Sequence, residues 1–139
     1  MNTLLIATML VGSASAHFMW MRHGPCTAPA KGTCAIVTFA EAAGSAGPEN
    51  LLDVVANKTS VWLEDGGKRT PLKMAKEPDG EEGAQLTAPI TTPPPYNLKL
   101  FTDFGPFSEQ RPPPANAPEL IYYGAAASVT RPSDWHGLD

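Results

Sequence analysis

The chain carries little charge and no excess of basic residues. Charged residues make up 17% of its 139 positions, against roughly 25% in an average domain. The formal net charge is −4. Proteins that bind nucleic acid normally present a basic patch or stripe, so we expect no nucleic-acid partner. Hydrophobic residues still amount to 42%, which is enough for one folded domain at this length.

Long apolar runs are also missing, apart from residues 4–11. Because a helix needs about 20 apolar residues to cross a bilayer, we expect no transmembrane segment in the mature chain. The short run precedes Ala14 and Ala16, which fit an A-x-A cleavage site, and this predicts a signal peptide over 1–16. Cleavage would leave a periplasmic or secreted domain of residues 17–139 that begins with His17. The alternative is a buried first strand or helix of a cytoplasmic domain.

Cysteine is scarce, with only Cys26 and Cys34 in the whole chain. In an exported protein, two cysteines so close in sequence most simply form one disulfide. The alternative is a pair of metal-binding thiolates beside His23, which we otherwise expect to be an exposed loop residue.

Short alternating segments separated by turn residues dominate the rest of the chain. Asp65-Gly66-Gly67-Lys68 is a strong hairpin signal, because glycine accepts positive φ without penalty. Residues 51–55 favour a helical turn. The expected strands are 17–22, 34–41, 59–64, 69–75, 84–88, 96–103 and 119–127. About seven short strands with little helix predict an all-β, antiparallel β-sandwich, and the proline clusters at 93–95 and 112–114 predict rigid connectors between strands.

A processed N-terminus would make His17 a candidate metal ligand, because the residue would offer its α-amine and its imidazole together. If the two cysteines face each other across the first hairpin, Met19 lies opposite Glu41 and on the same face as His17. Nitrogen, thioether and carboxylate donors together suit copper or nickel better than magnesium or calcium. The alternatives are that His17 only begins an edge strand, that Met19 fills the core, and that Glu41 is a solvated turn residue.

Five short motifs within residues 16–126 resemble a family of bacterial exported proteins that are often labelled periplasmic components of nickel or cobalt uptake. The motifs are Ala16-His17-Phe18-x-Trp20, Val37-x-Phe39-x-Glu41, Pro71-Leu72 after the glycine turn, Asp103-Phe104-Gly105, and Leu120-Ile121-Tyr122-Tyr123-Gly124-Ala125. The resemblance implies an immunoglobulin-like β-sandwich, export and the binding of one transition-metal ion.

The sequence therefore favours a carrier or uptake-associated protein for nickel, cobalt or copper, with a membrane transporter component as a further partner. The second hypothesis is a non-catalytic structural or interaction module of the cell envelope. The third is a copper-dependent oxidative enzyme, for which His136 is the remaining second imidazole. We find no Ser/His/Asp set and no phosphate-binding glycine loop, and so expect no enzyme. We expect Asp103 to be a turn residue before Gly105, and the alternative is that Asp103 and Tyr122 line a pocket.

Overall fold

The computed structural model describes residues 17–106 and 122–131, and it describes the side chains of residues 17–103 and of Thr130. The expected signal peptide, the proline cluster at 112–114, residues 119–121 and His136 lie outside the described residues.

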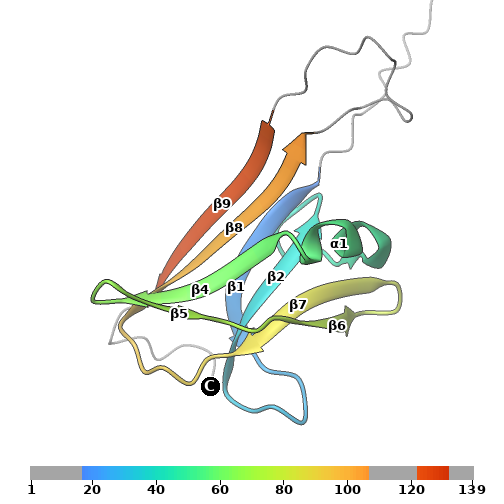
Figure 1. Cartoon of the computed structure of the whole chain (residues 1–139). Coiled ribbons are helices and arrows are strands. Elements are labelled where there is room, and N and C mark those ends of the chain that lie inside the picture. The colour runs from blue at the N-terminus through green and yellow to red at the C-terminus, as the bar shows by residue number, and fades with distance from the viewer. Residues whose placement is uncertain (1–16, 107–121, 132–139) are drawn as a thin grey trace, which may run out of the picture.

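One sheet, sheet A, carries the first two strands of the described chain. Its strands are β1 (Phe18–Pro25), β2 (Thr33–Ala40), β3 (Gly47–Pro48), β6 (Ala75–Asp79) and β7 (Gly83–Pro89). The order is β1-β2-β7-β3. β6 also pairs with β7, along the edge of β7 opposite to β2 and β3. The sheet is curled like half of a barrel (Figure 1). The loop after β1 reaches β6, because the hydroxyl of Thr27 donates a hydrogen bond to Glu77.

The second sheet, sheet B, packs against the first. It contains β4 (Thr59–Asp65), β5 (Lys68–Pro71), β8 (Tyr96–Pro106) and β9 (Tyr122–Arg131), in the order β5-β4-β8-β9. Every described strand pair in both sheets is antiparallel. The structure thus confirms an all-β fold of two antiparallel sheets.

The core lies between the two sheets and follows from the alternation of side chains along each strand. On β4, Val61 and Leu63 are buried, whereas Ser60, Trp62 and Glu64 lie on the outer face. The core side chains are Ala35, Val37, Leu52, Val55, Val61, Leu63, Ala84, Leu86, Tyr96, Leu98 and Leu100. Each fully buried Leu or Val contributes about 1.5–3 kcal/mol through the hydrophobic effect.

One short helix, α1 (Glu49–Ala56), covers an end of the sandwich between β3 and β4 (Figure 1). It buries Leu52 and Val55, which lie three residues apart and therefore on one face. On its exposed side Lys76 of β6 binds Glu49 and Asp53, at 2.7 and 2.8 Å. The helical turn predicted for 51–55 is confirmed and is longer than expected.

Several strand boundaries differ from the prediction, and proline is involved in the two largest differences at the N-terminal and middle strands. The single strand expected over 69–75 is wrong: β5 ends at Pro71, and the chain crosses to sheet A, where β6 begins at Ala75. The first strand continues through Gly24 to Pro25 although we expected it to end at Arg22. Proline is tolerated there because β1 lies at an edge of sheet A, where a missing N–H breaks no ladder on the open side.

Candidate functional site

The register of the β1–β2 hairpin corrects the predicted pairing of Met19 with Glu41. Met19 lies opposite Phe39, and Cys34 lies opposite Gly24 rather than Cys26. The predicted disulfide is confirmed, with a Cα–Cα distance of 5.0 Å between Cys26 and Cys34. The prediction failed because Cys26 follows the end of β1 and reaches back to Cys34 from the loop, so the two cysteines are not register partners.

This correction moves the register by two residues, which keeps each side chain on its predicted face. It also places a different pair at the same end of the hairpin. The last pair of the ladder is Phe18 with Ala40. His17 directly precedes β1 and Glu41 directly follows β2, so both lie one residue beyond this pair. We call these two residues the hairpin end.

At the hairpin end, His17 is half-buried and Glu41 is exposed. The imidazole of His17 lies against the ring of Phe39, with 5.6 Å between ring centroids. Met19 is partly buried and packs against the core, in agreement with the alternative that it fills space there. Within 17–106 and 122–131, no group of three or more His, Cys, Asp or Glu side chains is arranged to hold a metal ion.

The thiolate alternative is wrong, because both cysteines are consumed by the disulfide. His23 is also not an exposed loop residue. It belongs to β1, is half-buried, and its ring lies 5.7 Å from that of Tyr96, between centroids. The extension of β1 beyond Arg22 explains this position, since His23 then faces the core side with Met19 and Met21.

Asp103 and Tyr122 lie on neighbouring strands but at different rungs of the ladder. Asp103 pairs with Gly124 and Tyr122 pairs with Pro106, with an irregularity between Asp103 and Gly105. The backbone N–H of Asp103 donates to the carbonyl of Lys58 at 3.0 Å. The side chain of Tyr122 lies outside the described residues, so the proposed pocket between the two stays a prediction.

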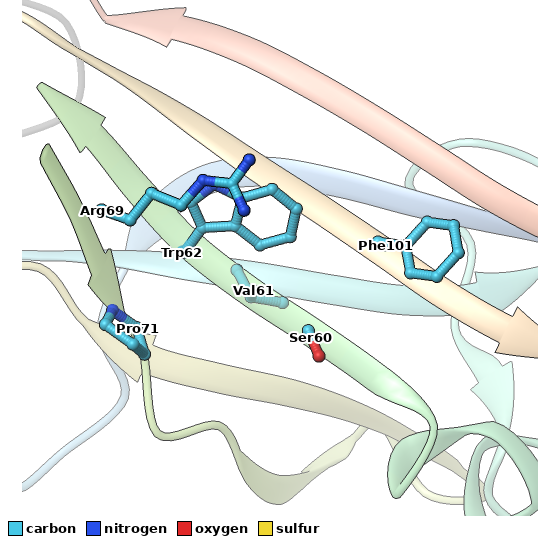
Figure 2. A pocket seen from close by; sticks show the side chains of 6 residues that line it. All are labelled: Ser60, Val61, Trp62, Arg69, Pro71 and Phe101. Carbon is cyan, nitrogen blue, oxygen red and sulfur yellow. The ribbon is translucent and has the colours of Figure 1, made fainter. Parts of the chain in front are cut away.

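A hollow on the outer face of sheet B was not predicted. It has a volume of about 500 Å³ and lies where β5 leaves β4 (Figure 2). Its lining comes from the β4–β5 hairpin and from β8: Ser60, Val61, Trp62, Arg69, Pro71 and Phe101. The alternation over 59–64 does place Ser60 and Trp62 outward, but the pairing of Ser60 with Phe101 joins residues 41 positions apart and had no local signal.

Charged side chains border this hollow. The guanidinium of Arg69 lies over the Trp62 ring, 4.9 Å from its centroid. Glu64 accepts a hydrogen bond from Lys99 at 2.8 Å and lies 3.6 Å from Nε of Arg69. The hydrogen bond from Lys99 lowers the pKa of Glu64 below its ordinary value of 4.5. One carboxylate is therefore shared between two cations.

No helix among the described residues has the length and apolar character that crossing a bilayer requires. In comparisons with known proteins, no protein-family model, no curated protein and no solved structure matches the chain.

Proposed function

We propose that the protein is exported and binds a late first-row transition metal (nickel, cobalt or copper) at the hairpin end, after cleavage behind Ala16. The β-sandwich, for which we propose an immunoglobulin-like arrangement, is the scaffold for this site. The observation that carries the proposal is the position of His17 and Glu41 directly beyond the Phe18–Ala40 pair, at the same end of one hairpin.

Three donors would come from these two residues. Cleavage converts the backbone nitrogen of His17 into an α-amine, which can chelate an ion together with the imidazole of the same residue. The contact with Phe39 already limits the orientations of the His17 imidazole. Less conformational entropy is therefore lost when the imidazole binds an ion. Glu41 would add a carboxylate oxygen and one negative charge. Nitrogen and oxygen donors of this kind suit copper and nickel.

Protons compete with metal for the same nitrogens. An α-amine has an ordinary pKa of about 7.7–8.0. Affinity should therefore rise as the pH rises through about 8. Such a site suits carriage or delivery to a membrane transporter component, in which the ion is cargo.

A titration of matched chains tests this proposal. The chain that begins with His17 is compared by calorimetry, using copper(II) and nickel(II), with a chain that retains Ala16. Retaining Ala16 turns the backbone nitrogen of His17 into an amide, which should weaken binding by more than about tenfold, the smallest loss that even an outer-shell change usually causes. Glu41→Gln should also weaken binding. Met19→Leu should not, because Met19 packs against the core.

Mass spectrometry of the secreted protein provides the necessary control, since it shows whether His17 is the first residue. Equal affinity of the two chains would refute chelation by the N-terminus. The interaction-module hypothesis would then be the better account of the sandwich.

A further inference from the structure

The hollow on sheet B combines apolar walls with a fixed cation, and no part of the proposal above uses it. Phe101 is 41% exposed and supplies an apolar wall of the hollow. Trp62 lies diagonally across the β4–β8 pair from Phe101, because Ser60 is the register partner of Phe101 and Trp62 that of Lys99. Such diagonal neighbours are about 7–8 Å apart, so both aromatic side chains line the same hollow.

The positive charge at the hollow is in excess. Lys99 binds Glu64 at 2.8 Å, and both side chains are mostly covered, at 31% and 25% exposed. Arg69 is farther from the same carboxylate, at 3.6 Å, and its side chain is 68% exposed. Glu64 is thus matched by Lys99, and Arg69 leaves one positive charge beside the aromatic walls, although the whole chain has a net charge of −4.

Arg69 is also held in place. Its guanidinium stacks on Trp62, while Glu64 lies at Nε. A stacked guanidinium keeps its planar N–H edge available for a second carboxylate, which it can bind through two parallel hydrogen bonds. Figure 2 shows Arg69 above Trp62 and Phe101 on the far side of the hollow.

We propose that this hollow binds a saccharide unit that carries a carboxylate, such as a uronic acid within an acidic glycan. The C–H face of the pyranose ring would pack on Phe101 and Pro71, and its carboxylate would pair with Arg69. The hydroxyls would exchange hydrogen bonds with Ser60, which is exposed in the lining. A simple inorganic anion would make no use of the aromatic walls, and a wholly apolar ligand would leave the charge of Arg69 without a counterpart. The site lies on the outer face of sheet B, so it is independent of the metal proposal.

The test uses the secreted protein with trigalacturonic acid and its methyl ester, which differ in charge but share the ring. Binding is followed by calorimetry and by tryptophan fluorescence. We expect the acid to bind at least about tenfold more tightly than the ester, because a carboxylate pairs with arginine and an ester does not. Arg69→Gln should abolish this preference. Lys68→Gln is the matched control, since it removes an exposed cation from the neighbouring position of β5, outside the hollow lining.

A second pair of variants tests the apolar wall. Phe101→Ala should weaken binding of both acid and ester. Phe18→Ala is the control: Phe18 is also exposed but lies on sheet A, so its loss should leave binding unchanged. Equal binding of acid and ester, equal effects of Arg69→Gln and Lys68→Gln, or binding of neither ligand would each overturn the proposal. Sedimentation provides one more test. If the protein self-associates and Phe101→Ala abolishes this self-association, a second copy of the chain occupies this face and the proposal is overturned.

Discussion

The hydroxyl oxygens of Thr59 and Thr102 lie 2.9 Å apart and join β4 to β8 where β4 begins. Thr59 also donates a hydrogen bond to the carbonyl of Val55, at 2.8 Å. Because a hydroxyl has one proton, Thr59 accepts in the contact with Thr102, and Thr102 is the donor. Thr102 is fully buried, at 0% exposed, so its donor relies on that single acceptor.

This direction predicts unequal effects of two similar substitutions. Thr102→Val removes the donor and should lower the free energy of unfolding by about 0.5–1.5 kcal/mol. Thr59→Val leaves the buried Thr102 hydroxyl without its acceptor and should cost more, about 1–3 kcal/mol. Urea unfolding of both variants checks the order. A smaller loss in Thr59→Val would show that the hydroxyl of Thr102 has another acceptor.

The disulfide should supply a substantial part of the stability of the sandwich. It closes a loop between residues eight apart, and the chain-entropy model gives about 2–3 kcal/mol for a ring of this size. Replacing both Cys26 and Cys34 by alanine should lower the free energy of unfolding by that amount. Reducing agent should destabilise the wild-type protein to a similar extent and leave the double variant unaffected. If both proteins respond alike to reductant, the loss has another origin.

Two glycines of sheet A should differ in their tolerance of alanine. A Cβ at Gly47 would overlap the carbonyl oxygen of Phe39, which belongs to the backbone of β2 and cannot turn aside. A Cβ at Gly24 would lie 2.6 Å from the side-chain ends of Arg22 and Ile36, which can move. Gly47→Ala should therefore cost about 1–3 kcal/mol, in the range of overpacked sites, and Gly24→Ala less. Thermal unfolding compares the two, and equal losses would contradict the argument.

The pairing of Glu64 with Lys99 predicts a pH dependence. Since the hydrogen bond from Lys99 lowers the pKa of Glu64 in the folded protein, folding favours the ionised carboxylate. Its contribution is complete above the ordinary value of 4.5 and is lost as the pH falls below that value through the folded pKa. Wild type should exceed Lys99→Gln in stability at pH 7, and the difference should shrink in acid. Denaturant midpoints at both pH values measure it. A constant difference would assign the role of Lys99 to packing alone.

Local patterns predicted the elements whose signals lie within one segment. The alternation over 59–64 and the Asp65-Gly66-Gly67-Lys68 turn gave β4 and its hairpin partner, and the pair of cysteines gave the disulfide. The β6 strand was missed because Ala75–Asp79 is mostly exposed and contains a proline, so it carries no alternating apolar signal.

The candidate sites depend on pairing between segments, and here sequence patterns carry less information. The Met19–Glu41 prediction required the register of the first hairpin. We took that register from the two cysteines, but Cys34 pairs with Gly24 in the ladder while its disulfide partner is Cys26, so the predicted register was wrong. The hollow requires Ser60 to meet Phe101 and Arg69 to reach Trp62, contacts that exist only once sheet B has assembled. Export and metal binding stay predictions.

The first ladder of sheet A begins at Phe18, the second residue after the expected cut. Trimming there would leave every rung of that hairpin intact while creating a new ligand at its tip. Under the proposed function, cleavage would create the metal ligand without removing a residue of this ladder, so spectroscopic markers of the hairpin would not report the change.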